Sequence, residues 1–127
     1  MKLFKNKKGI TLVELLAVLV ILGIIAAIAV PTVSTLISNT QDRANVESAN
    51  SYVQAARLYS LSNPEATSVT NGALDGDVSN KVTFGDTIIF GFNAGSGVVD
   101  AVTPAAATTA NGTSIIWDGQ GSFELNE

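Results

Sequence analysis

The sequence contains neither cysteine nor histidine. Without cysteine there is neither a disulfide framework nor a thiolate metal site. The lack of histidine removes the usual base of a nucleophilic triad and the commonest metal ligand, so carboxylates are the only plentiful titratable groups. We therefore expect no enzymatic activity, and the sequence offers no candidate catalytic, cofactor-binding or metal-ligating residues.

Basic side chains are scarce after the first nine residues. Lys2, Lys5, Lys7 and Lys8 are four of the seven, and removing the segment up to Gly9 leaves three basic side chains against eleven acidic ones, a formal charge of −8. Neutralising phosphates requires clustered Lys and Arg, so a chain this acidic is poorly suited to general nucleic-acid binding. We predict no specific nucleic-acid partner.

Polar residues are almost missing between Ile10 and Val30, where only Thr11, Glu14 and Gly23 interrupt the aliphatic character. As a helix this segment is about 31 Å long, enough to cross the hydrocarbon core of a bilayer. The basic residues precede it, so the positive-inside rule keeps the amino terminus in the cytoplasm and places the rest of the chain outside.

Glu14 decides between three interpretations of this apolar run. An ordinary signal peptide would have a shorter apolar region, ending in the small residues at Ala27–Ala29. A carboxylate at the centre of a membrane helix costs roughly 2.5 to 3.5 kcal/mol, so its presence calls for a partner. A membrane anchor with an incidental glutamate is the second interpretation, and a helix whose glutamate is paired during assembly is the third, which we favour.

The string GITLVELLAVLVILGIIAAIAVP, residues 9–31, resembles the class III signal sequence of type IV pilins and pseudopilins. The shared features are a basic leader, Gly9 before the cut, an aliphatic residue at Ile10, Glu14 as the fifth mature residue, Gly23 within the helix and Pro31 at its outer end. Many members of this family carry phenylalanine where this chain has Ile10. The resemblance implies cleavage by a prepilin peptidase between Gly9 and Ile10, followed by N-methylation of Ile10.

The resemblance also supplies a partner for Glu14. Cleavage leaves a positively charged α-amine on Ile10, which can pair with Glu14 of a neighbouring subunit inside an apolar filament core. Removing either charge would strand the other in a dry environment, which is expensive. We therefore assign Glu14 to assembly and to the axial register between subunits.

Gly23 and Pro31 are predicted to break the helix. Proline removes a backbone hydrogen bond and clashes with the preceding turn, and glycine disfavours the helix entropically. The simpler alternative is a kink in the isolated subunit, whereas the resemblance implies local melting when subunits enter a filament.

Beyond Pro31 the sequence becomes amphipathic, and its apolar residues recur mostly every three or four positions. The predicted stripe is Val33, Leu36, Ile37, Thr40, Ala44, Ala49, Tyr52, Val53, Ala56 and Tyr59. We expect the helix to stop at Ser62, because the residue before Pro64 disfavours α geometry. The predicted organisation is a cleaved leader (1–9), a membrane or filament-core helix (10–30), its amphipathic half (31–63) and a head (64–127).

The predicted fold is α+β, with the long helix packed against a small antiparallel sheet of three or four strands in the head. Residues 65–80 and 103–113 are expected to be turns and loop, with strands at 82–84, 87–92 and 98–102 and a hairpin that pairs 114–117 with 122–125. The expected core places Phe90 or Phe92, Trp117 and Phe123 against Val53, Ala56 and Tyr59. The alternative is an exposed surface of aromatic residues for adhesion or DNA stacking.

Two short motifs in the head have more than one interpretation. Asp75 and Asp77 could contribute to a calcium site, but a solvated turn is the commoner use of such a pair. Asn111, Gly112 and Thr113 match the glycosylation acceptor pattern, which at three residues is a weak signal.

The hypothesis that follows is a structural subunit of a type IV pilus or related filament. Its partners would be further copies of itself, the membrane, prepilin peptidase, the filament-assembly machinery and minor pilins. It would be a single-pass protein of the cytoplasmic membrane before assembly and part of an extracellular filament afterwards. The alternatives are a pseudopilin of a type II secretion or DNA-uptake system, and a membrane-anchored extracellular binding domain that does not polymerise.

The cleavage site can be tested on the protein recovered from the cell surface. Amino-terminal sequencing is expected to begin at Ile10, and mass spectrometry is expected to find that residue methylated. A mature chain that begins at Val30 would instead identify an ordinary signal peptide.

Overall fold

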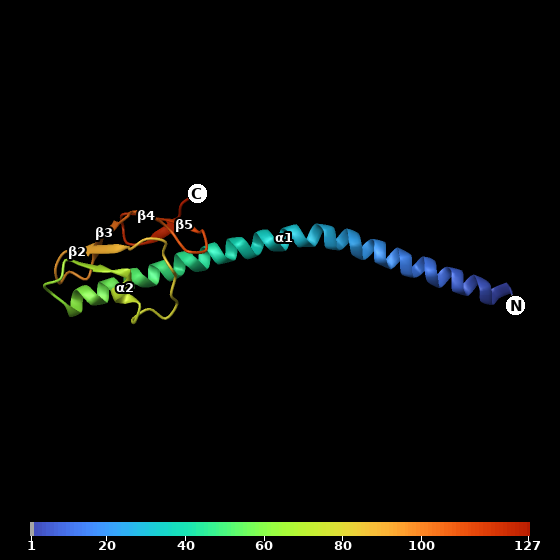
Figure 1. Ribbon diagram of the computed structural model, residues 1–127, viewed down its shortest axis with the longest axis horizontal. Helices are drawn as coiled ribbons and strands as arrows, with labels where there is room; N and C mark the ends of the chain where they lie inside the picture. Colours follow the sequence, from blue (N-terminus) through green and yellow to red (C-terminus); the bar gives the residue numbers. More distant parts are fainter. Residues whose placement is uncertain (1) are drawn as a thin grey trace. The chain divides into compact units, whose positions relative to one another are not determined.

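The computed structural model describes the backbone of residues 2–127 and the side chains of residues 10–127. The chain forms two compact units, Met1–Asn39 and Thr40–Glu127, which are described separately. The elements, in order, are α1 (Lys2–Ser62), β1 (Ser68–Thr70), α2 (Asn71–Leu74), β2 (Ile89–Phe92), β3 (Val99–Thr103), β4 (Ala106–Thr108), β5 (Ser114–Trp117) and β6 (Phe123–Leu125) (Figure 1). The predicted α+β class is confirmed.

Helix α1 ends where the sequence predicts. The backbone N–H of Asn63 donates to the carbonyl of Tyr59 at 2.9 Å, and the Asn63 side-chain amide donates to the same carbonyl at 3.1 Å. Pro64 follows and cannot continue the backbone ladder because it lacks an N–H. The last turn of α1 is therefore closed by Asn63, and the chain turns back towards β1.

The strands form two antiparallel sheets of three strands each, in the orders β1-β2-β3 and β4-β5-β6. Phe90 of β2 lies opposite Val69 and Val102, and Trp117 of β5 lies opposite Phe123. The strands lie on one side of the second half of α1 (Figure 1). Packing of the helix against an antiparallel β-structure is thus confirmed, with the strands divided between two sheets instead of one.

Several predicted boundaries in the head are wrong. Residues 82–84 form no strand, since Phe84 makes only an isolated bridge to Thr109. The predicted loop 103–113 contains β4, and the predicted turns at 65–80 contain β1 and α2. These errors arise because tertiary contacts, and not local propensity, decide the structure here. The short Ala/Thr segment of β4 is a strand because it pairs with β5.

The core of the head joins the second half of α1 to both sheets. Its aromatic residues cluster around Phe123, whose ring contacts Phe90 and Trp117 edge-on at centroid distances of 6.4 and 5.6 Å. The predicted core residues Val53, Ala56, Phe90, Phe92, Trp117 and Phe123 are all buried, and Tyr59 is half-buried against them. The interpretation of the aromatic residues as core, and not as an adhesive surface, is confirmed.

The predicted apolar stripe divides at the head. Ala49, Tyr52, Val53 and Ala56 are buried. The earlier members of the stripe, Val33, Leu36, Ile37, Thr40 and Ala44, are all exposed in the single chain. The sequence therefore predicted the pattern correctly but could not show that only its second half faces the protein's own sheets.

Polar side chains of α1 attach the helix to β6. The carbonyl oxygen of the Asn50 amide accepts the backbone N–H of Phe123 at 2.6 Å, and its NH₂ group donates to the Phe123 carbonyl at 3.2 Å. Arg57 Nη2 donates to the Gly121 carbonyl at 3.3 Å. Because β6 is an edge strand, these bonds satisfy backbone groups that would otherwise remain unpaired.

The β5–β6 turn is organised by one carboxylate. Asp118 accepts hydrogen bonds from the backbone N–H groups of Gln120, Gly121 and Ser122 and from the Ser122 hydroxyl. These donors, with the Ser122 N–H contributing most, hold the pKa of Asp118 well below its usual range. The turn therefore depends on a charged Asp118.

Replacing Phe123 by alanine is expected to lower the free energy of unfolding of the head by about 3 to 5 kcal/mol, because it removes the ring on which the core aromatics converge. Thermal or denaturant unfolding of the full chain in detergent, followed by circular dichroism, measures the change. Glu124→Ala, at the exposed neighbouring position, is the control and should have little effect. Equal effects in the two variants would contradict this description of the core.

The contribution of Asp118 is expected to depend on pH. A carboxylate whose folded pKa is depressed stabilises the fold fully above its unfolded pKa, about 3.9, and loses that contribution as the pH falls further. Asp118→Ala should therefore lower the unfolding midpoint at pH 7, and the gap to the unaltered chain should shrink below about pH 4. A gap that is constant down to pH 2 would show that the charge is not what holds the turn.

Candidate functional site: the apolar half of helix α1

The first unit of the chain presents an apolar surface that its own residues do not cover. The large aliphatic side chains from Ile10 to Val30 are between 52% and 69% exposed. Ile10–Ser62 is long and apolar enough to cross a membrane, and its most apolar stretch is 0% buried in the structure. A helix that is apolar on every side occurs inside a membrane or inside an assembly.

Glu14 is the one ionisable side chain on this surface. It lies four residues after Ile10, hence on the same face of the helix and about 6 Å further along its axis. The side chain is exposed, and among residues 10–127 no ion pair involves it. A carboxylate in a membrane helix is costly unless it is paired, and the described part of the chain offers Glu14 no ion-pair partner.

The predicted cleavage residues lie at the boundary of what the structure describes. Gly9 lies within α1, and the Ile10 side chain is 56% exposed. The lysines of the predicted leader lie outside the described side chains. Cleavage after Gly9 and methylation of Ile10 stay predictions.

The helix is continuous through the predicted break. Both Gly23 and Pro31 lie inside α1, so the single chain has no interruption at either residue. A Cβ atom built on Gly23 would meet no heavy atom within 4 Å, which means that packing within the chain does not require glycine there. Melting of residues 23–31 on entry into a filament concerns a different state and stays a prediction.

Hydroxyl groups next to Pro31 bond to the carbonyls of the helix. Thr32 Oγ1 lies 2.9 Å from both the Ile28 and the Ala29 carbonyl oxygens. The Ser34 and Thr35 hydroxyls donate to the carbonyls of Val30 and Pro31, each at 3.1 Å. Such bonds are a common arrangement of Ser and Thr in helices, and none of these four reaches the Ala27 carbonyl, which loses its usual helical donor because Pro31 has no N–H. The sequence analysis did not predict these bonds, although three hydroxyl residues within four positions of a helical proline indicate that side chains can bond to helix carbonyls there.

The two weak motifs of the head make structural contacts. Asp75 accepts a hydrogen bond from the Tyr52 hydroxyl at 2.6 Å, and burial together with this bond raises the pKa of Tyr52 far above its usual value. No group of three side chains suited to a metal ion occurs in the described part of the chain. The structure therefore adds no ligand to Asp75 and Asp77 for the calcium alternative.

Thr113 anchors the 109–113 turn to α1. Its buried hydroxyl donates to Asp42 Oδ1 at 2.8 Å and accepts from Asn45 Nδ2 at 2.6 Å. In the folded head the threonine of the Asn111–Thr113 acceptor pattern is therefore already engaged. Modification of Asn111 remains an open prediction.

Residues 4–30 match the family model described as the prokaryotic N-terminal methylation motif, which is the class III signal of type IV pilins and pseudopilins. The resemblance predicted from the sequence is thus confirmed for this segment. No curated protein and no solved structure matches the chain.

The motif supports a pilin-like or pseudopilin-like protein that is processed by prepilin peptidase, and proteins with this motif are structural, not enzymatic. The motif and the exposed apolar helix are together consistent with anchoring in a membrane before assembly.

Proposed function

We propose that this chain is the structural subunit, or pilin, of a type IV pilus or related filament. The observation that carries the proposal is the uncovered apolar surface from Ile10 to Val30 with Glu14 as its one charge, inside the matched methylation motif. In the membrane, lipid covers this surface. In a filament, the same surfaces of neighbouring copies would cover one another.

Processing converts the membrane anchor into an assembly element. Cutting the peptide bond after Gly9 releases the basic leader, which would hold the helix in the membrane, and creates an α-amine on Ile10. Methylation keeps that amine positively charged. The helix then has a cation at its first residue and an anion one turn later, on the same face.

In the proposed filament the amine and Glu14 pair between chains. The amine of one subunit and Glu14 of its neighbour are the two charges available in an otherwise aliphatic interior. The aliphatic surfaces adhere without directional preference. Each large side chain that becomes fully buried contributes a favourable free energy of roughly 1.5 to 3 kcal/mol. The ion pair is what selects one axial register from the many that such surfaces allow.

The proposed partners are further copies of the chain, prepilin peptidase, the filament-assembly machinery and minor pilins. The head would be displayed outside the cell on the assembled filament. A pseudopilin of a secretion or DNA-uptake system would use the same amino-terminal segment, and the motif does not separate the two.

Replacing Glu14 by alanine is expected to leave membrane insertion intact and to abolish filaments. Breaking a buried ion pair on one side costs about 3 to 5 kcal/mol, which corresponds to a loss of at least a hundredfold in subunit association. Membrane fractionation measures insertion, and shearing followed by electron microscopy measures filaments. Glu65→Ala, which removes an exposed carboxylate in the head, is the matched control. Filaments at normal yield from Glu14→Ala would overturn the role of the ion pair.

A further inference from the structure

Arg43 is an unpaired cation on the surface of an acidic head. Only three basic side chains follow Gly9 in the sequence, and of these Arg57 is bonded to the Gly121 carbonyl. Arg43 is exposed, and among residues 10–127 it takes part in no ion pair. A free cation in such a chain is suited to meeting an anion on another molecule.

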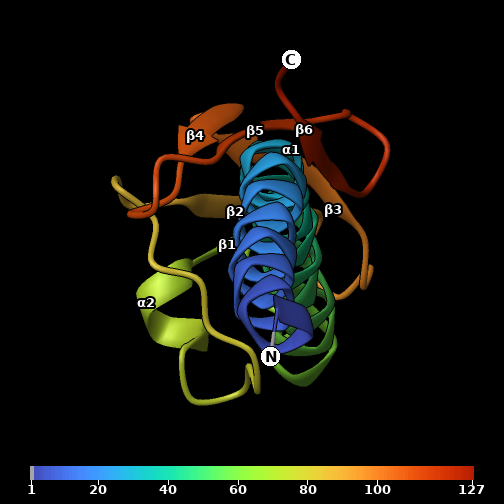
Figure 2. The same ribbon diagram turned by 90° about the vertical axis from the view of Figure 1, so that its right-hand side faces the viewer.

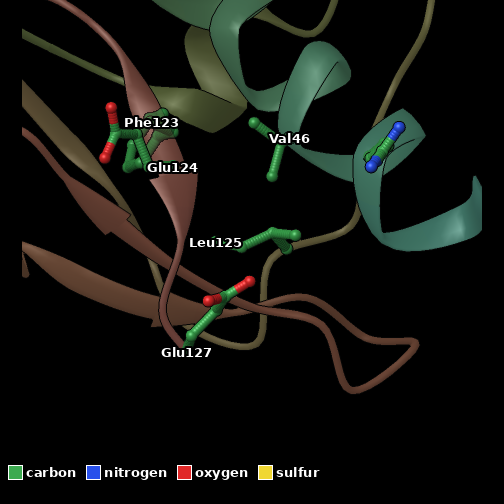
Figure 3. Close-up of a pocket in the computed structure, with 6 residues that line it drawn as sticks. Val46, Phe123, Glu124, Leu125 and Glu127 are labelled. Atoms are coloured by element: carbon green, nitrogen blue, oxygen red, sulfur yellow. The ribbon is translucent and has the colours of Figure 1, made fainter. Parts of the chain in front are cut away.

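Arg43 borders a hollow between α1 and β6. The hollow has a volume of about 450 Å³ and is lined by Arg43, Val46, Phe123, Glu124, Leu125 and Glu127. Figure 3 shows the Val46 and Leu125 side chains facing one another across it, with the Glu124 carboxylate on the other side of the strand. Val46 and Leu125 therefore form an apolar seat, which is bordered by the cation of Arg43 and by the carboxylates of Glu124 and Glu127.

A second hollow lies further along α1. It has a volume of about 400 Å³ and is lined by Ala55, Leu58, Tyr59, Ser62, Asn63 and Asp77. Leu58 is 66% exposed, so it offers an apolar side chain to a partner at this hollow. Asp77 is exposed as well. The second hollow thus pairs an exposed apolar side chain with an anion.

The two hollows occupy different flanks and different levels of the helix. The first involves β6 and the second the segment just after α2, and Figure 2 shows β6 and α2 on opposite sides of α1. Val46 and Leu58 are separated by roughly 20 Å along the helix axis. Two unlike patches on one subunit join identical copies head to tail, which gives a ring if the rotation between copies closes and an open filament if it does not.

We propose that neighbouring heads associate head to tail through these two hollows. Leu58 of one copy packs on the Val46–Leu125 seat of the next, and Asp77 pairs with Arg43 across the same contact. Leu58 meets apolar side chains and Asp77 meets the one cation of the first hollow, and the arrangement extends a polymer along the direction of the helix. This inference rests on the proposed filament function and adds to it a specific contact between heads.

Charge reversal tests the contact in the full chain expressed with its assembly system. Arg43→Glu and Asp77→Arg alone are each expected to lower filament yield by roughly tenfold or more, since like charges would then face each other. The double variant restores the opposite charges and should recover most of the yield. Asp86→Arg changes an exposed acid that lines neither hollow and is the charge-matched control.

The absence of cysteine permits a direct second measurement. The double variant Arg43→Cys, Asp77→Cys, treated on filaments with a short bismaleimide, is expected to give a ladder of dimers, trimers and longer products. Either single-cysteine variant should give none, because in a head-to-tail contact each position meets the other one and not itself. Dimers from a single-cysteine variant, or no ladder from the double variant, would overturn the proposed contact.

The outcomes separate the two proposals. If the unaltered chain forms filaments and neither single charge reversal lowers the filament yield, the head contact is overturned and the filament function stands. The same holds if the double reversal fails to recover yield although circular dichroism shows a folded head. No filaments from the unaltered chain would overturn both.

Discussion

Coverage of the apolar surface of α1 is the requirement on which the rest of the molecule depends. From Ile10 to Val30 the aliphatic side chains have no partner within their own chain. Such a surface is stable only where water is excluded, so the unit must lie in a membrane or among other chains. In the proposed filament the single carboxylate at Glu14 would make this coverage specific, because an apolar surface alone accepts a neighbour at many positions.

The same helix serves a second purpose beyond residue 40. There its buried face supplies Tyr52, Val53 and Ala56 to the core, while Asn50 bonds to the edge strand β6. The head is too small to bury a large core with its own strands, so it uses the helix as one wall of that core. Helix α1 runs without a break from Lys2 to Ser62, so one element carries both surfaces.

The sequence predicts what is encoded locally. The amino-terminal motif, the helix stop before Pro64 and the β5–β6 hairpin depend on neighbouring residues, and each was found where expected. The strands β1 and β4 were missed because Ser68–Thr70 and Ala106–Thr108 become strands only through pairing with distant segments.

The same division applies to the candidate sites. Glu14 and Ile10 could be proposed from the sequence because they lie one helical turn apart in a linear signal, and their roles stay predictions. The two hollows could not be predicted from the sequence, because each joins α1 to residues far along the chain. From the sequence, Asp77 was interpreted as part of a solvated turn or as a calcium ligand, and Leu125 only as a strand residue.

Electrostatics limits how the heads can pack together. After removal of the segment up to Gly9 the formal charge is −8 per subunit, so neighbouring heads repel one another at short range. Salt screens this repulsion beyond about 8 Å at physiological ionic strength, but not within a direct contact. A close contact between heads is therefore favoured where it is uncharged or where it uses one of the three remaining cations. Arg57 is bonded inside its own head, Lys81 lines neither hollow, and Arg43 borders the seat formed by Val46 and Leu125. A contact at that seat places one of the few available positive charges against an otherwise negative neighbour, which offsets part of this repulsion.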